Sequence, residues 1–202
     1  MEVVVSTRNR NKFKEISRIL KNSNIKTLSL DKFPQAPKVK EDASTFEGNA
    51  SKKALKIARF TGSLTVADDS GLLVDALRGE PGIFSARFAG KGATYEKNNK
   101  KLLRLLTGVP KKKRGATFIC CVAVADSRGI IGIVKGICRG YISESPVGVC
   151  GFGYDPIFVI PKLKKTFAQL PPALKNRISH RAKAFAKAKK AILKYIQKNI
   201  KA

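Results

Sequence analysis

Apolar segments of two different periods alternate along this chain, and that alternation restricts the folds open to it. Short runs rich in Val, Ile and Leu are typical of buried strands, whereas amphipathic helices repeat an apolar residue every three or four positions. The strand-like runs are 3–5, 25–30, 64–67, 116–125 and 130–141, and the helix-like segments are 13–20, 45–60 and 95–106. Strands interleaved with helices predict an α/β fold.

The two longest strand-like runs indicate the kind of sheet. Asp126-Ser127-Arg128-Gly129 joins them and is typical of a hairpin turn. A hairpin adds antiparallel pairing to the parallel pairing of strand–helix–strand units, so we expect a mixed sheet. The 202 residues show neither an internal repeat nor a linker, and we expect residues 1–202 to form one domain.

The chain has the features of a cytoplasmic protein. No apolar stretch approaches the roughly 20 residues of a membrane helix, and residues 1–5 run directly into strand-like sequence, so we expect no signal peptide and no membrane association. The four cysteines lack the spacing of zinc or redox motifs. Cys120 and Cys121 lie in the apolar run 118–125 and are predicted to be buried thiols in a reducing compartment.

Positive charge dominates the composition. The chain has 41 Lys and Arg against 14 Asp and Glu, a net charge of +27, so nucleic acid must be considered as a partner. Much of the excess lies in residues 111–114 and in the last twenty residues. The latter also carry one apolar helical stripe, formed by Phe185, Ala188, Ile192, Tyr195 and Ile196. We therefore predict a surface helix with solvated lysines; a nucleic-acid surface is the alternative.

A polar segment, Thr7-Arg8-Asn9-Arg10-Asn11-Lys12, separates the first strand-like run from the first helix-like segment. The N–H groups at a helix start are unpaired and lie at the positive end of its dipole, which favours a bound phosphate. Lys12 would add a charge, and Thr7 and Asn9 would add hydrogen bonds. The alternative is ordinary capping of the helix by Asn9 or Asn11.

Asn49 and Lys53 lie one helical turn apart, so their side chains project on the same side. They border the apolar face set by Phe46, Ala50 and Ala54. A cation and an amide at that border could point into a cleft. On spacing alone, however, we expect Lys53 to extend past the core into water.

Two adjacent carboxylates, Asp68 and Asp69, follow the strand-like run 64–67 and precede Ser70-Gly71. Their repulsion must be offset by a cation or by several N–H donors. A few hard oxygen ligands suit Mg²⁺, which keeps several waters and shares its coordination with phosphates. A carboxylate at such a site can also serve as a general base. A turn with a capping aspartate is the equally open alternative.

A glycine-rich segment, Gly151-Phe152-Gly153-Tyr154-Asp155-Pro156, combines small residues with aromatic ones. Small neighbours leave space beside a ring, which suits stacking of a base, and Asp155 can accept a hydrogen bond from a base or ribose. The alternative is a structural loop with two buried aromatics.

The one histidine, His180, lies next to Arg181, with Lys175 upstream. A lone histidine is more often structural than catalytic. At a helix start, however, His180 and Arg181 offer directional donors for carbonyl oxygens such as those of a 6-oxopurine. Lys175 could reach a phosphate or a base.

The order of these motifs resembles the ITPase family, also called the non-canonical purine NTP pyrophosphatases or XTP/dITP diphosphatases. The matching blocks span nearly the whole chain. They are Thr7-x-Asn9-x-x-Lys12, Thr45-Phe46-x-x-Asn49-Ala50-x-x-Lys53-Ala54, Ala67-Asp68-Asp69-Ser70-Gly71-Leu72, Pro81-Gly82-Ile83-Phe84-Ser85-Ala86-Arg87-Phe88, Gly151-Phe152-Gly153-Tyr154-Asp155-Pro156-Ile157-Phe158 and Ser179-His180-Arg181.

The resemblance implies an elongated mixed sheet flanked by helices, with two lobes around a central nucleotide-binding cleft, and a homodimer. It also implies Mg²⁺-dependent hydrolysis of purine nucleoside triphosphates such as ITP, dITP and XTP to the monophosphate and pyrophosphate. A water bound to Mg²⁺ would attack the α-phosphorus. A 6-oxo edge would satisfy buried polar groups that the 6-amino group of ATP leaves unpaired.

The resemblance also implies a role for each matching residue. Asp69 would be the base and a metal ligand, and Asp68 would support it. In relatives, two acidic residues often precede the block that begins at Thr45; here Lys40 takes the first of those places, so Glu41 is the second candidate metal ligand. The substrate-binding residues would be Thr7, Arg8, Asn9, Arg10, Asn11, Lys12, Lys53, Ser70, Phe152, Gly153, Tyr154, Asp155, Lys175, His180 and Arg181.

Two alternatives stay open at the level of sequence. A Maf-type nucleotide pyrophosphatase shares an N-terminal phosphate loop and prefers modified pyrimidine nucleotides, although the blocks at 151–156 and 179–181 argue against it. The other alternative is a basic nucleic-acid-binding protein with an inactive site, which the net charge of +27 would support. Weak non-specific nucleic-acid binding is expected from such a charge in either case.

Overall fold

The computed structural model describes residues 2–21 and 25–200, and the chain divides into two compact units. The first unit comprises Met1–Asp69, Cys120–Gly136 and Arg181–Ala202, and the second comprises Ser70–Ile119 and Ile137–His180.

The strands form a mixed sheet, as the sequence predicts. Their order is β2-β1-β3-β5-β6-β7-β8, and β4 pairs with β3. The β1 strand is parallel to β2 and β3, whereas β3–β4, β6–β7 and β7–β8 are antiparallel. The bounds are β1 (Glu2–Val5), β2 (Lys26–Ser29), β3 (Thr65–Val74), β4 (Pro81–Gly82), β5 (Gly115–Ala125), β6 (Ile130–Ile142), β7 (Phe158–Ile160) and β8 (Lys165–Thr166).

Helices flank the strands close to the predicted positions, so the predicted α/β class is confirmed. They are α1 (Arg10–Leu20), α2 (Phe46–Thr61), α3 (Tyr95–Leu105), α4 (Pro172–Ile178) and α5 (His180–Ile200). Side chains cap three of them: Asn9 caps α1, Thr45 caps α2 and Thr94 caps α3. None of the helices described is both long and apolar enough to cross a membrane.

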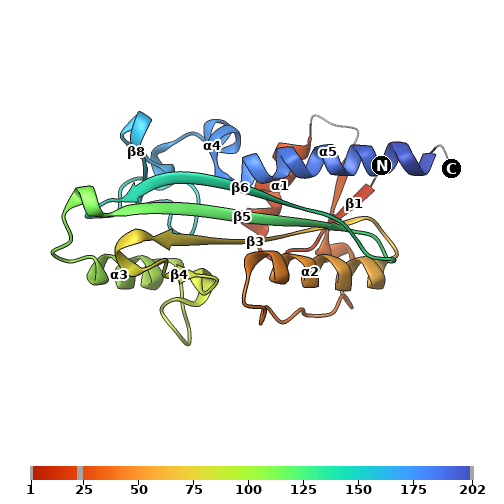
Figure 1. Ribbon diagram of the computed structural model, residues 1–202, viewed down its shortest axis with the longest axis horizontal. Coiled ribbons are helices and arrows are strands. Elements are labelled where there is room, and N and C mark those ends of the chain that lie inside the picture. Colours follow the sequence, from red (N-terminus) through yellow and green to blue (C-terminus); the bar gives the residue numbers. More distant parts are fainter. Residues whose placement is uncertain (1, 22–24, 201–202) are drawn as a thin grey trace. The chain divides into compact units, whose positions relative to one another are not determined.

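In the first unit, α1 and α5 lie on one side of the strands and α2 lies on the other (Figure 1). Side chains of a strand point alternately to opposite faces. Accordingly, Val3, Val5 and Val66 pack with residues of α1 and α5, whereas Val4 and Ala67 pack with residues of α2. Both faces are buried here, which explains the uninterrupted apolar run Val3–Val5 of β1.

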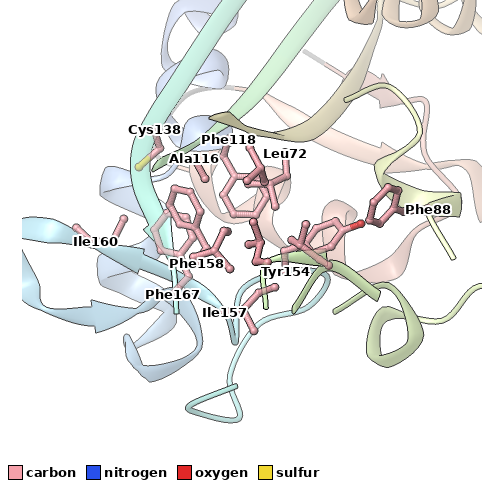
Figure 2. Packing of buried hydrophobic residues seen from close by; sticks show 14 of the residues in the cluster. Leu72, Phe88, Ala116, Phe118, Cys138, Tyr154, Ile157, Phe158, Ile160 and Phe167 are labelled. Carbon is pink, nitrogen blue, oxygen red and sulfur yellow. The ribbon is translucent and has the colours of Figure 1, made fainter. Parts of the chain in front are cut away.

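In the second unit, aromatic rings form the centre of the core (Figure 2). Phe118 lies 4.5 Å from Phe158 and 5.9 Å from Phe167 between ring centroids. Tyr154 belongs to the same buried cluster. The glycine-rich segment that leads into β7 is therefore anchored to this core through Tyr154.

Several sequence predictions about burial are confirmed. Cys120 and Cys121 are fully buried and belong to no disulfide. Phe185, Ala188 and Ile192 on α5 are also fully buried, so this helix docks through the predicted apolar stripe.

One prediction about β3 is wrong. The sequence predicts a strand-like run, 64–67, that ends at the two aspartates, and a turn at the aspartates is one of its two interpretations. Instead β3 continues from Thr65 to Val74, through both aspartates. Asp68 and Asp69 are therefore strand residues and do not form a turn.

Candidate active site

The strand β3 directs its two adjacent carboxylates to opposite faces of the first unit. Val66, which packs toward α1 and α5, and Asp68 lie two residues apart and share one face. Ala67, which packs toward α2, and Asp69 share the other. Asp68 and Asp69 are 2% and 7% exposed, so each needs polar partners of its own.

The partners of Asp69 come from α2 and from the segment that precedes it. The Nδ2 of Asn49 donates a hydrogen bond to Asp69 Oδ2 at 3.1 Å. The Nζ of Lys53 lies 3.6 Å from Asp69 Oδ1, 2.6 Å from Glu41 Oε1 and 2.7 Å from the backbone oxygen of Asp68. The site is thus a cluster in which the cation of Lys53 lies between the carboxylates of Asp69 and Glu41.

The interior position of Lys53 corrects the expectation that it extends into water. Lys53 is only 8% exposed, and its ammonium group faces Asp69 and Glu41. Spacing along α2 could not reveal this, because the two acids reach Lys53 from other segments of the chain.

Burial and neighbouring charges compete at this cluster. Burial raises the pKa of Asp69 above its ordinary value, although Lys53 and Lys12 act against that rise. Burial alone would lower the pKa of Lys53, but the carboxylates of Asp68, Asp69 and Glu41 outweigh it, and the pKa is raised. Lys53 therefore stays charged, and Asp69 is a stronger proton acceptor than an exposed aspartate.

The partners of Asp68 come from α1 and α5. The Nζ of Lys12 lies 3.0 Å from Asp68 Oδ2, and Nη2 of Arg181 lies 3.6 Å from the same atom. Arg181 also donates from Nη1 to Glu15 Oε2 at 2.7 Å. Against the effect of burial, Asp68 and Glu15 raise the pKa of Arg181. Asp68 thus orients two cations, and one of these, Arg181, had been predicted to recognise the base.

Glu15 is a residue of this network that the sequence analysis missed. It is buried on α1 beside Ile16, and an acid next to an apolar face was a signal that could have identified it. It pairs with Arg181 from a distance of 166 residues in sequence.

The polar segment before α1 does form the helix cap that the sequence analysis considered. Asn9 Oδ1 accepts hydrogen bonds from the backbone N of Asn11 at 3.0 Å and of Lys12 at 3.2 Å. Arg8 donates to the backbone oxygen of Ala36 at 2.7 Å. Arg10 and Asn11 are exposed and Thr7 is half-buried. Capping and phosphate binding are compatible, because Lys12 projects from the same turn.

In the second unit, the predicted base-binding segment is a loop closed by Asp155. Its Oδ2 accepts a hydrogen bond from the backbone N of Phe152 at 2.7 Å and pairs with Lys175 Nζ at 2.5 Å. The same ammonium group lies 4.8 Å from the centroid of the Phe152 ring, a cation–π distance. Phe152 is half-buried, and Tyr95 lies beside it with 5.9 Å between ring centroids.

Residues from other segments of the second unit hold this loop in place. Asn99 Nδ2 donates to the backbone oxygen of Gly153 at 3.0 Å. The hydroxyl of Tyr154 donates to the backbone oxygen of Ser85 at 2.9 Å, and burial raises the pKa of Tyr154. Nothing in the sequence around Asn99 indicates this contact, since it joins α3 to a loop more than fifty residues later.

His180 and Ser70 complete the predicted set. His180 is 3% exposed, and its ring stacks on Phe118 with 4.5 Å between centroids and 9° between planes. Packing in a core is more common for a lone histidine than a catalytic role. Ser70 is half-buried in β3 directly after Asp69.

The loop geometry leads to a prediction for Gly151. Its φ is +82°, and an added Cβ would lie 2.1 Å from Asp155 Oδ2. We expect Gly151→Ala to displace the Asp155 carboxylate and to lower the free energy of unfolding by about 2 kcal/mol, from backbone strain and a weakened buried hydrogen bond. Denaturant unfolding would measure this. Gly132→Ala is the matched control, because Gly132 has open space around its Cα; equal stability losses in both variants would contradict the prediction.

The fold and these contacts define a general class, an α/β protein with charged groups buried around one strand. The first unit is an α/β structure whose inner strand β3 carries two buried carboxylates, each paired with cations from helices on its own face. A more specific assignment comes from comparison with known proteins. A family model described as the Ham1 family matches residues 3–191, and the chain belongs to that family. The resemblance to the ITPases is thereby confirmed.

Individual relatives agree over nearly the full chain. A dITP/XTP pyrophosphatase of Desulforamulus reducens is 50% identical over 188 residues, which are 93% of this chain and 94% of that protein. A dITP/XTP pyrophosphatase of Geobacter sulfurreducens is 47% identical over 184 residues, 91% of this chain and 92% of that protein. The solved structure of a HAM1 protein from Coxiella burnetii superposes with a TM-score of 0.86 at 37% identity, covering 96% of this chain and 99% of that one.

Proposed function

We propose that this protein hydrolyses non-canonical purine nucleoside triphosphates, such as ITP, dITP and XTP, to the monophosphate and pyrophosphate. Its membership of the Ham1 family and its similarity to proteins named dITP/XTP pyrophosphatases support the reaction. The observation that carries the proposal is the cluster of Asp69, Lys53 and Glu41, in which Asp69 and Lys53 are buried and Glu41 is half-buried. It brings a proton acceptor, a cation for phosphate and a second metal-binding carboxylate into contact.

The triphosphate would be bound by cations of the first unit. Lys12 pairs with Asp68, and Lys53 pairs with Asp69. Both lysines act electrostatically on Asp69, beside which the reaction is proposed. Side chains of residues 7–11 would add hydrogen bonds at the start of α1, where the helix dipole also favours a phosphate. Because positioning and electrostatics supply most of the catalysis of phosphoryl chemistry, these cations would contribute directly to the rate.

The carboxylates fit a magnesium ion as cofactor. Among the described residues there is no group of three or more His, Cys, Asp or Glu that could hold a metal ion. Mg²⁺ does not need one, because it binds through one or two carboxylates, waters and substrate phosphates. Asp69 and Glu41 would hold it, and Asp68 would support them through its contacts with cations. When bound, Mg²⁺ would offset the charge of the phosphates.

Asp69 would then accept a proton from the water that attacks the α-phosphorus. The bond between the α-phosphorus and the bridging oxygen breaks, and pyrophosphate leaves. The raised pKa of Asp69 favours this role, since a general base is most effective when its pKa approaches the working pH. Asn49 and Lys53 would keep the carboxylate oriented.

The base would be recognised by residues of the second unit together with Arg181. Phe152 would stack on the purine ring, with Gly153, Tyr154 and Asp155 in the same loop and Lys175 beside it. His180 and Arg181 would complete the set, and Ser70 would contact the substrate. A 6-oxo group would satisfy buried donors that the 6-amino group of ATP leaves unpaired, and unpaired buried groups are costly.

The function is tested with a panel of nucleoside triphosphates and identification of the released phosphate species. With Mg²⁺ present, we expect pyrophosphate release from ITP, dITP or XTP, and slower release from ATP by roughly 10²-fold or more. Comparison with UTP and dTTP separates this activity from that of a Maf-type enzyme. Equal turnover of ATP and ITP, or orthophosphate as the first product, would contradict the proposal.

The remaining proposals concern the state of the protein in the cell. We propose a homodimer that acts in the cytoplasm, in keeping with the ITPase resemblance. The net charge of +27 would add weak, salt-dependent binding to nucleic acids. Salt-dependent binding of DNA without any pyrophosphate release would instead favour a nucleic-acid-binding protein with an inactive site.

A further inference from the structure

Three consecutive residues before α2 are each tied to a side chain of that helix. Glu41 Oε1 pairs with Lys53 Nζ at 2.6 Å, and Asp42 Oδ1 pairs with Lys52 Nζ at 2.5 Å. The backbone N of Ala43 donates to Asn49 Oδ1 at 3.0 Å. The segment 41–43 is thus fixed against the first turns of α2.

Close packing at Gly48 supports the same arrangement. An added Cβ at Gly48 would lie 2.9 Å from Ala43 Cβ and 3.1 Å from Thr45 Oγ1. The side chain of Thr45 in turn caps α2 by accepting from the backbone N of Gly48 at 3.0 Å. The segment that carries Glu41 therefore lies directly on the start of α2, with little space to shift.

Asn49, like Lys53, connects this segment to β3. Its Oδ1 accepts from Ala43, and its Nδ2 donates to Asp69 Oδ2 at 3.1 Å. The backbone N–H of Ala43 requires an acceptor, which fixes the orientation of the amide and directs the NH₂ group to Asp69. At 1% exposure, Asn49 makes both contacts away from water. An amide is well suited to this position, because it donates to a carboxylate and accepts from an N–H at once.

We propose that Asn49 is a positioning residue that holds the Asp69 carboxylate and the Glu41 segment in one fixed arrangement, and so preorganises the seat of the divalent cation. The inference rests on the proposed function, because it concerns the same two carboxylates. Lys53, one turn further along α2, offsets their charge. Asn49 sets the direction of Asp69 without competing for its charge. Groups that orient metal ligands in this way contribute to metal affinity although they do not touch the metal.

The test compares Asn49→Ala with a matched variant, Asn98→Ala. Asn98 is also a buried helical amide, 2% exposed, and it accepts from the backbone N of Ala89 and donates to the backbone oxygens of Ser85 and Ala86. It lies in the second unit and contacts neither Asp69 nor Glu41. Both variants therefore lose a buried amide, and only one loses the proposed positioning group. If Asn49→Ala does not fold, Asn49→Ser provides a smaller change at the same position.

Two quantities are measured besides thermal stability. The first is the affinity of the nucleotide-free protein for Mn²⁺, by titration calorimetry, and the second is the Mg²⁺ concentration that gives half-maximal pyrophosphate release from ITP. We expect Asn49→Ala to weaken Mn²⁺ binding and to raise the half-saturating Mg²⁺ concentration by about 10–100-fold. Asn98→Ala should lower the melting temperature with both quantities unchanged.

The outcomes separate this inference from the proposed function. A wild-type protein that binds Mn²⁺ but releases no pyrophosphate would end the proposed function, and the Mn²⁺ titration would still decide the role of Asn49. Equal Mn²⁺ affinity in wild type and Asn49→Ala, or no measurable Mn²⁺ binding in either, overturns the inference. Equal changes in the Asn49 and Asn98 variants also overturn it, because they would reflect general destabilisation.

Discussion

Asp69→Asn is expected to fold normally and to lose nearly all pyrophosphate release. The change preserves the shape of the side chain and removes its ability to accept a proton, so we expect kcat to fall by roughly 10²–10⁴-fold. The single amide oxygen of the variant can keep the hydrogen bond from Asn49 Nδ2, and Lys53, which faces the other oxygen of Asp69, keeps its contacts with Glu41 and the backbone oxygen of Asp68. Steady-state kinetics with ITP and Mg²⁺ measure the effect.

A suitable control removes a carboxylate from the same unit but not from the cluster. Asp31 is exposed, and its carboxylate accepts from the hydroxyl of Ser29. Asp31→Asn should retain the wild-type rate. An Asp69→Asn variant with wild-type turnover and an unchanged melting temperature would remove Asp69 from the role of base.

Lys53→Met is expected to have the second largest effect. Methionine fills similar space without a charge, so the acids at 41 and 69 lose the cation between them. Loss of one group that stabilises charge in the transition state should lower kcat/KM by about 10²–10³-fold. Loss of its hydrogen bond to Glu41 and of its buried hydrogen bond to the backbone of Asp68 should lower the free energy of unfolding by about 1–3 kcal/mol.

The neighbouring lysine provides the matched control. Lys52 lies on the same helix, but it is exposed and pairs with Asp42. Lys52→Met removes the same charge and should change kcat/KM little, because exposed ion pairs contribute about 1 kcal/mol or less. If the two variants lost activity equally, the effect would come from net charge and not from the position of Lys53.

The local pattern of the sequence was sufficient to predict most of the fold. The helix over residues 46–61 has a polar cap at Thr45, an apolar face and a glycine at its end, so its limits follow from the sequence. The hairpin of β5 and β6 follows in the same way from its turn residues. The continuity of β3 could not be predicted, because Asp, Ser and Gly are typical turn residues and become strand residues here through tertiary partners.

The candidate site was predictable in its residue types but not in its contacts. Lys53 and Asp69 stand out because a family resemblance marks them, while the spacing along α2 suggested an exposed lysine. The partners that hold Lys53 inside are Glu41, Asp68 and Asp69, and they come from two other segments. Contacts such as Glu15 with Arg181 or Asn99 with Gly153 depend on pairing across long sequence distances, which local periodicity does not encode.

The alternation of side chains in β3 makes its length as important as its composition. A single residue inserted between Val66 and Asp68 would exchange the two acids between faces. Asp69 would then turn toward Lys12 and Arg181, and Asp68 toward Asn49 and Lys53. Both positions hold an aspartate, but the two aspartates cannot exchange places because their partners differ. Within the family, replacements of apolar residues along this strand should therefore be tolerated far more readily than insertions or deletions.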